Sequence, residues 1–247
     1  MRHAILPILK LGLAACLVAG GAGCDRLSGG QEQAPVESGQ PGNKAGATTG
    51  NLAGTYSIAA ASNPGGGGGY KGSVTITPEG DVYKLAWAIP ESPPYSGVAL
   101  LEGSTLAVGW GMGAQYGVVV YRVSGGKLTG RWATAASGPN AGTEVIEGPP
   151  GLSGTYNVVS AKGPSGGTYT GSVTITPTGG THTVQWNLSN GSFSGVGIRR
   201  GDLFIVGWGE TGKGAGVVSY EVSGSKLTGV WAVPGGTQLG SESLARP

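Results

Sequence analysis

Cysteine is nearly missing from this 247-residue sequence, which contains only Cys16 and Cys24. Both lie within the first 24 residues, so the rest of the chain has no disulfide, no thiolate metal site and no cysteine nucleophile. Whatever fold the remaining residues adopt must therefore be stabilised by its packed core alone.

Charge is also scarce, because Asp, Glu, Lys and Arg together make up 11% of the residues and the net charge is +2. Such a balance provides no basic field, which argues against nucleic acid as a partner. Glycine is abundant, with 52 residues, but it does not recur at every third position as collagen requires. Six Trp, nine Tyr and many Val provide enough apolar area for a core, so the composition excludes a fully disordered chain.

Side chains for catalysis or metal binding are few. Beyond the first 24 residues the only histidine is His182, and no serine elbow with a histidine and acid partner accompanies it. Residues 207–214 resemble a phosphate-binding loop, but Gly214 follows Lys213 where Ser or Thr is needed, so we expect a hairpin loop there. No cluster of His, Asp and Glu has metal-ligand spacing. The sequence therefore predicts a protein that is not an enzyme and holds neither cofactor nor metal.

The N-terminal segment has the features of an export signal. Arg2 and Lys10 precede an apolar stretch and a run of small residues, after which the chain becomes polar. Gly21-Ala22-Gly23-Cys24 is similar to a bacterial lipobox, so we expect residues 1–23 to be a lipoprotein signal peptide and Cys24 to carry the lipid. Residues 24–50 read as a flexible tether. The alternative is an ordinary signal peptide and a soluble secreted protein.

An internal repeat with a period of about 99 residues organises the rest of the chain. The segment Gly72–Pro78 returns unchanged at Gly171–Pro177, and Lys127-Leu128-Thr129-Gly130 returns as Lys226-Leu227-Thr228-Gly229. A period of this length corresponds to one domain per repeat, since solenoid and propeller repeats are much shorter. We therefore expect two homologous domains, at residues 51–148 and 151–247.

Each repeat alternates apolar and polar residues with a period of two, which indicates β-strands. In the first copy the pattern predicts eight strands, near residues 54–60, 70–77, 82–89, 95–101, 104–110, 116–124, 127–134 and 142–146. Short turns between them predict antiparallel neighbours in an up-and-down order. Eight such strands with one buried face avoid free edges by closing, so we expect an all-β protein of two small eight-stranded barrels. Two β-sandwiches are the alternative.

Short motifs in the two copies resemble those of two known groups of proteins. Gly-Thr-Tyr in the first strand and Leu-Thr-Gly-x-Trp near the end of each copy resemble the meander barrels of the lipocalin and avidin kind. Together with Gly-Val-Val-x-Tyr and Gly-Thr-Glu, they also resemble a group of tandem-repeat bacterial envelope lipoproteins labelled fibronectin-binding, over residues 52–244. The first resemblance implies a small closed barrel, and the second implies attachment to an extracellular-matrix protein.

The candidate binding residues are those that recur in both copies and face inward. They are aromatic side chains and one acid per copy, namely Trp87, Trp110, Trp132, Trp186, Trp208, Trp231, Tyr121, Tyr220, Glu144 and Glu242. Trp combines a large apolar area with an N–H donor, so these residues suit either a filled core or a pocket for a small ligand. One carboxylate per barrel is too few for glycosidase chemistry and is expected to anchor the closing strand or to form a polar contact at the barrel mouth.

These features predict a lipid-anchored protein of the bacterial cell envelope, on the periplasmic side or at the cell surface, that displays two binding modules. One alternative is a carrier of a small apolar ligand inside the barrels. The other is an adhesin that binds an extracellular protein such as fibronectin through its outer strands or through the glycine-rich loops 65–69 and 209–214.

Overall fold

The computed structural model describes residues 51–90 and 92–246. The expected signal peptide, the lipidated Cys24 and the tether lie outside these residues. Within the described part of the chain, no helix has the length and apolar character needed to cross a membrane. The only helical element there is a single 3-10 turn, η1 (Pro64–Gly66).

Sixteen strands account for most of the described residues. The strands of the first repeat are β1 (Gly54–Ser62), β2 (Ser73–Glu79), β3 (Val82–Ala88), β4 (Tyr95–Glu102), β5 (Thr105–Gly111), β6 (Tyr116–Ser124), β7 (Lys127–Thr134) and β8 (Gly142–Glu147). Those of the second repeat are β9 (Gly154–Lys162), β10 (Gly171–Thr178), β11 (Thr181–Leu188), β12 (Gly191–Arg200), β13 (Leu203–Gly209), β14 (Ala215–Ser223), β15 (Lys226–Ala232) and β16 (Gly240–Ala245). The eight strands predicted for the first copy are confirmed, with bounds that differ by a few residues.

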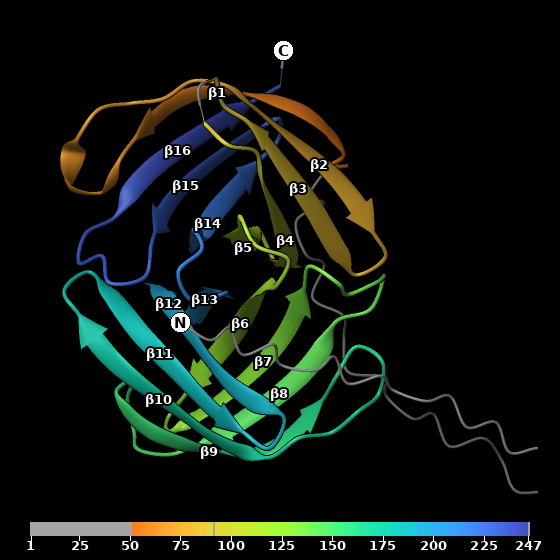
Figure 1. The fold of residues 1–247 in the computed structure, drawn as a ribbon, viewed down its shortest axis with the longest axis vertical. Helices are drawn as coiled ribbons and strands as arrows, with labels where there is room; N and C mark the ends of the chain where they lie inside the picture. The colour runs from red at the N-terminus through yellow and green to blue at the C-terminus, as the bar shows by residue number, and fades with distance from the viewer. Residues whose placement is uncertain (1–50, 91, 247) are drawn as a thin grey trace, which may run out of the picture. The chain divides into compact units, whose positions relative to one another are not determined.

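The strands form two closed antiparallel barrels of eight strands each (Figure 1), which confirms the predicted fold class and excludes the two sandwiches. The second barrel is a continuous meander of β6 to β13 that closes by pairing β13 with β6. The first barrel contains β1 to β5 and β14 to β16, and it closes through the pairs β1–β16 and β5–β14. The second barrel is thus inserted in the sequence of the first.

The prediction that residues 51–148 and 151–247 each close one barrel is therefore wrong. Each repeat contributes five strands to one barrel and three strands to the other. Strands β6 and β14 occupy equivalent positions in the two repeats, so their sequences make either one a suitable partner for β5. Turn lengths and strand alternation predict hairpins between strands that are neighbours in the sequence. They do not predict whether β5 pairs with β6 or with the equivalent strand β14.

Two short connections carry the chain between the barrels. Residues 112–115 join β5 to β6 and residues 210–214 join β13 to β14, and the two segments hydrogen-bond to each other. Met112 N donates to Gly214 O at 2.8 Å, and the amides of Ala114 and Gln115 donate to the Glu210 carboxylate at 3.1 and 3.0 Å. The segment that the sequence suggested was a hairpin loop is therefore a crossover between barrels, because β13 pairs with β6 and β14 pairs with β5.

Glycine allows the strands to pass close to each other where they leave one barrel for the other. A Cβ atom on Gly109 of β5 would lie 2.0 Å from the carbonyl oxygen of Gly117 in β6. The equivalent Gly207 of β13 would place its Cβ 2.2 Å from the carbonyl oxygen of Gly216 in β14. Any side chain would collide with backbone at either point, so this backbone contact requires glycine.

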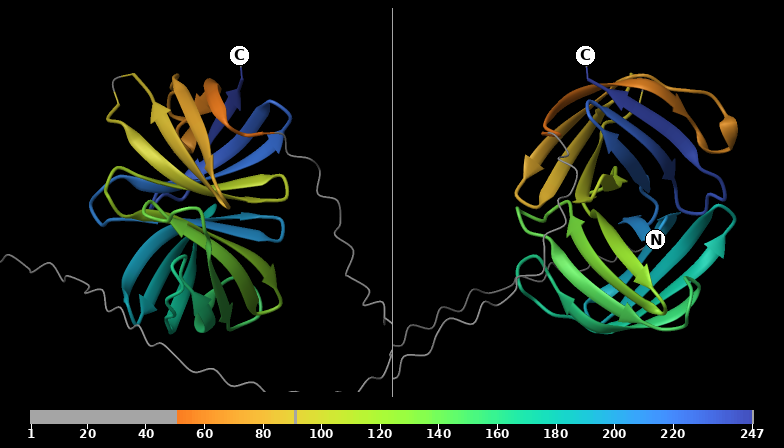
Figure 2. Two further views of the ribbon diagram at one scale, coloured as in Figure 1. Left: turned by 90° about the vertical axis from the view of Figure 1, so that its right-hand side faces the viewer. Right: turned by 180° about the vertical axis from the view of Figure 1, so that it is seen from behind.

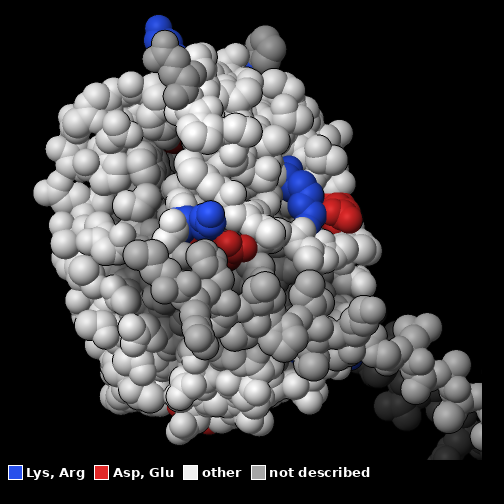
Figure 3. Space-filling view, in the orientation of Figure 1, with Lys and Arg blue, Asp and Glu red and all other residues white. Residues whose placement is uncertain are grey.

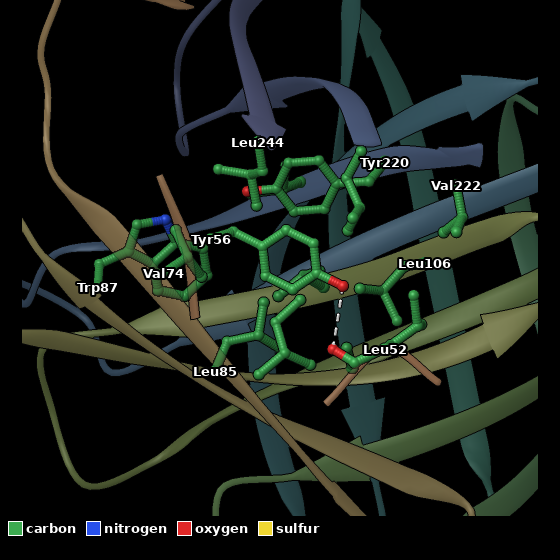
Figure 4. Close-up of a cluster of buried hydrophobic side chains, with 14 of the residues drawn as sticks. Leu52, Tyr56, Val74, Leu85, Trp87, Leu106, Tyr220, Val222 and Leu244 are labelled. Carbon is green, nitrogen blue, oxygen red and sulfur yellow. Dashed lines mark hydrogen bonds between the residues drawn. The ribbon is translucent and has the colours of Figure 1, made fainter. Parts of the chain in front are cut away.

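The interior of each barrel is filled by the alternating inward residues of its strands. In the first barrel they include Tyr56, Leu85, Leu106 and Tyr220, which converge on one another in Figure 4. The hydroxyl of Tyr56 donates to the carbonyl oxygen of Leu52 at 3.2 Å and so satisfies its own buried polar group. The second barrel has a matching interior cluster around Tyr121, Tyr156 and Phe204.

The walls of the two barrels lie against each other in Figure 2. A further apolar cluster, here called the inter-barrel cluster, joins these outer faces. It contains buried residues of both barrels, among them Val98, Leu100, Val118, Val120, Val196 and Ile198. Strands β4, β6 and β12 are therefore buried on both faces along part of their length, which explains why they read as continuous apolar runs rather than strict alternations. Of the outward side chains of β6, Arg122 is exposed, whereas Val120 is buried.

Polar contacts reinforce the join between the barrels at its edge. Lys84 of β3 donates to the carbonyl oxygens of Ala135 and Ser137 at 3.0 and 2.8 Å, and Arg131 of β7 pairs with Glu102 of β4 at 3.0 Å. Figure 3 shows how few charged side chains the visible face of the molecule carries, in line with the composition. The two barrels therefore form one packed unit rather than two independent domains.

Candidate functional site

A pocket of about 300 Å³ opens in the first barrel. Three of its wall residues are the tryptophans Trp87 of β3, Trp110 of β5 and Trp231 of β15. Asn63, Tyr70, Ile89, Ser92, Tyr95, Met112, Val218 and Glu242 complete the lining. The pocket volume lies at the lower end of the range for sites that hold small organic molecules.

The second barrel contains an equivalent pocket of about 160 Å³. Its tryptophans are Trp132 of β7, Trp186 of β11 and Trp208 of β13. Val119, Thr134, Glu144, Tyr169, Leu188, Asn190 and Phe193 complete the lining. Each pocket thus contains three tryptophans, one glutamate and one tyrosine from the connection that follows the barrel's β1 or β9 strand.

Both pockets depend on the exchange of strands between repeats. In the first barrel, Trp87 and Trp110 belong to the first repeat, whereas Trp231 and Glu242 belong to the second. In the second barrel the contributions are reversed. Neither repeat alone supplies the complete set of side chains for the pocket that it helps to form.

The indole rings occupy space that neighbouring glycines leave free. Trp231 of β15 is paired with Gly240 of β16, and a Cβ on that glycine would lie 2.4 Å from the indole ring. Trp132 and Gly142 repeat this arrangement in the second barrel, with a distance of 2.5 Å. Since any larger residue would displace the ring, glycine on the neighbouring strand determines how the tryptophan lies against the barrel wall.

Glu242 lines the first pocket, and among the described residues it is the only acidic or basic side chain in that lining. The residue is 2% exposed. Its Oε1 atom accepts hydrogen bonds from the Tyr220 hydroxyl and from Trp87 Nε1, the latter at 3.3 Å. Glu144, also 2% exposed, accepts corresponding bonds from Tyr121 and from Trp186 Nε1, the latter at 3.5 Å.

Burial changes the ionisation of these groups. Loss of hydration raises the pKa of Glu242 above its ordinary value, although the hydroxyls of Tyr220 and Tyr70 and the indole of Trp87 offset part of the increase. The pKa of Glu144 is raised for the same reason and is partly offset by its own tyrosine and tryptophan neighbours. Desolvation and the nearby carboxyl group also raise the phenol pKa values of Tyr70 and Tyr95, so both phenols are neutral at physiological pH.

Aromatic rings pack edge to face and in stacked pairs around the first pocket. Trp87 and Tyr95 are stacked with ring centroids 5.1 Å apart, and Tyr95 is tilted against Trp110 at 5.2 Å. Tyr70 contacts Trp231 edge-on at 6.3 Å. In the second barrel, Phe193 replaces Tyr95 and lies 5.2 Å from Trp208. Such pairs hold one another in place, so the walls are preorganised.

Several polar atoms of the pocket residues remain unsatisfied. Within the part of the chain that the structure describes, the buried Nε1 atoms of Trp132 and Trp231 have no well-formed hydrogen bond, and neither has Oε2 of Glu242. Unpaired buried polar atoms are uncommon in folded proteins, because each costs about 1–3 kcal/mol. The two indoles occupy equivalent positions in the two barrels, so the same unmet donor occurs twice.

The structure brings together most of the residues singled out from the sequence. All six tryptophans and both glutamates line the two pockets. Tyr121 and Tyr220 do not line them but lie behind the glutamates as hydrogen-bond donors. Sequence reasoning missed Tyr70, Tyr95, Tyr169 and Phe193, although the repeat contains the signal, since an aromatic residue stands at the same place in both copies.

The remaining candidates lie elsewhere. His182 packs edge-on against Phe204 at 5.3 Å and is absent from the lining of both pockets. Burial, followed by the charge of Arg199, lowers its pKa. Among the residues with described positions, no group of three or more His, Cys, Asp or Glu side chains is arranged to hold a metal ion. Comparisons with protein-family models, with curated proteins and with solved structures gave no match.

Proposed function

We propose that this protein is a non-enzymatic binding protein of the bacterial cell envelope whose barrels each hold a small ligand in the aromatic pocket. The observation that supports this most strongly is the buried indole N–H of Trp231, which belongs to the wall of the first pocket and has no hydrogen-bond partner among the described residues. A buried N–H without a partner is uncommon in a core that is filled only for stability. A ligand with a hydrogen-bond acceptor would satisfy it.

Attachment to the membrane forms part of this proposal. It rests on the sequence of the leader, in which Cys24 follows a run of small residues, and on the polar segment that separates Cys24 from β1. Replacing Cys24 with Ser is expected to move the protein from the membrane fraction to the soluble fraction and to abolish metabolic labelling with palmitate. Membrane association that is unchanged in this variant would contradict the lipid anchor.

Tryptophan emission offers a direct test of ligand binding, because all six tryptophans of the sequence line the two pockets. The purified protein is titrated with fatty acids, quinones, haem and glycans. A saturable shift in emission with one of these classes is expected. The same titration on a Trp110→Phe variant and on a Trp208→Phe variant assigns the shift to the first or the second barrel.

A well-folded protein whose emission responds to no small molecule would contradict the ligand-binding proposal. If that protein instead bound immobilised fibronectin, the adhesin alternative would be favoured. Gly67→Ser, within the glycine-rich segment 65–69, is the matched variant for that case, since no atom lies within 4 Å of the Cβ position of Gly67 and its φ of −81° is open to any residue.

A further inference from the structure

The first pocket contains a buried carboxyl group with no positive partner among the described residues. Glu242 is 2% exposed, and none of the ion pairs found among the described residues includes it. Of the residues with described positions, no Lys, Arg or His lines the pocket. Buried carboxylates in proteins are normally paired with a cation or fully hydrogen-bonded, because an isolated buried charge is costly.

The two oxygens of this carboxyl group differ. Oε1 accepts hydrogen bonds from Tyr220 and Trp87, whereas Oε2 is buried and has no well-formed hydrogen bond to any described residue, although the Tyr70 hydroxyl lies close enough to help stabilise the carboxylate. Because Glu242 lines the pocket, a molecule that enters the pocket and displaces the adjoining aromatic side chains can bring a donor to this oxygen. The free acceptor therefore selects ligands that carry an N–H or O–H group.

The walls of the pocket favour a cation as that donor. The faces of aromatic rings carry partial negative charge, and cations bind most favourably over Trp, followed by Tyr and Phe. Trp87, Trp110 and Trp231, together with Tyr70 and Tyr95, surround the space next to the carboxyl group. Five electron-rich rings and one carboxylate favour a positively charged ligand in this pocket. An anionic ligand would find no positively charged group there.

We propose that the first pocket binds a small organic ammonium ion, whose N–H groups donate to Oε2 of Glu242 and whose carbon skeleton packs against the indole rings. This inference rests on the proposed function and names its ligand class. The unpaired Nε1 of Trp231 would donate to an oxygen atom of the same ligand. The volume of about 300 Å³ limits the ligand to a small amine.

Three probes of similar size and different charge test the proposal on the unaltered protein. They are 2-phenylethylammonium, the neutral 2-phenylethanol and the anion phenylacetate. Binding is followed by the indole N–H signals in a two-dimensional NMR spectrum, in which Trp87, Trp110 and Trp231 report on the first barrel. We expect the ammonium ion to bind there at least about tenfold more tightly than the alcohol and phenylacetate not to bind.

A pair of glutamine variants identifies the group responsible. Glu242→Gln keeps the shape of the side chain and removes its charge, so ammonium affinity in the first barrel is expected to fall by about tenfold to 100-fold while alcohol binding changes little. Glu221→Gln makes the same charge change on the exposed face of β14, next to Tyr220, and is expected to leave affinity unchanged. Circular dichroism checks that both variants fold.

Acidification provides an independent readout. Among the described residues, the titratable groups that face Glu242 are the phenols of Tyr70, Tyr95 and Tyr220, whose pKa values are all raised, so within this set only Glu242 gains a proton between neutral and acidic pH. Ammonium affinity should therefore fall as pH decreases through the pKa of this carboxyl group, while alcohol affinity should not. The Glu242→Gln variant should show no such dependence.

The outcomes separate this inference from the proposed function. If 2-phenylethanol or phenylacetate binds as tightly as the ammonium ion, the pocket binds small molecules but the ammonium proposal is wrong. If the ammonium ion fails to bind while a fatty acid, quinone, haem or glycan does, the conclusion is the same. If no compound from either set binds, both proposals are overturned.

Discussion

The crossing of β5 and β6 offers a sharp test of the inserted-barrel architecture. A Gly109→Ala substitution places a methyl group 2.0 Å from the backbone oxygen of Gly117. Carbon and oxygen need at least about 3 Å, so the two strands must separate by about 1 Å. The obstacle is backbone in a barrel wall and cannot rotate away, unlike a side chain. Overpacking of this kind costs about 1–3 kcal/mol.

The loss is measured as the free energy of unfolding in urea and as a melting temperature. For a unit of this size, each kcal/mol corresponds to about 2–4 °C, so the melting temperature should fall by about 2–12 °C. Gly207→Ala should lower the melting temperature by a similar amount, because its Cβ would lie 2.2 Å from the backbone oxygen of Gly216. Gly138→Ala is the matched control, since no atom lies within 4 Å of its Cβ position, and it should change stability by less than about 0.5 kcal/mol.

An unchanged melting temperature in both Gly109→Ala and Gly207→Ala would refute this reasoning. It would mean that the strands do not approach so closely where they pass between barrels. A loss of stability equal to that of Gly138→Ala would lead to the same conclusion, since the effect would then come from the unfolded chain rather than from a contact.

Three other predictions concern the buried glutamate and the repeat. Tyr220→Phe removes one of two hydrogen bonds to the buried carboxyl group of Glu242 and should lower the free energy of unfolding by about 1–3 kcal/mol in chemical denaturation. The raised pKa of Glu242 means that the folded state holds this proton more tightly than the unfolded chain. Wild-type stability relative to Glu242→Gln should therefore fall as pH rises above the ordinary value of 4.5, by at most about 1.4 kcal/mol per pH unit; the opposite slope would contradict the assigned direction. A fragment of residues 51–148 contains five strands of one barrel and three of the other, so it should be a dimer in light scattering, whereas a folded monomer would show that residues 112–115 can form a hairpin.

Much of the candidate site could be predicted because the two copies of the repeat can be compared residue by residue. A tryptophan that recurs at an inward strand position in both copies must face the interior, and all six do. The unsatisfied donors of Trp132 and Trp231 could not be predicted, since a hydrogen bond depends on which side chains meet across the barrel. For the same reason, the hydrogen bonds that Tyr220 and Trp87 donate to Glu242 are visible only in the folded protein.

The sequence by itself determined the strands, their inward faces and the number of barrels, because alternation, turn residues and the repeat are local properties of the chain. Only the tertiary structure decided which strands close which barrel. Strands β6 and β14 present nearly the same residues to β5, so local pairing preferences cannot choose between them. The choice depends on the crossover segments, the close contact at Gly109 and the inter-barrel cluster, all of which join residues far apart in the sequence.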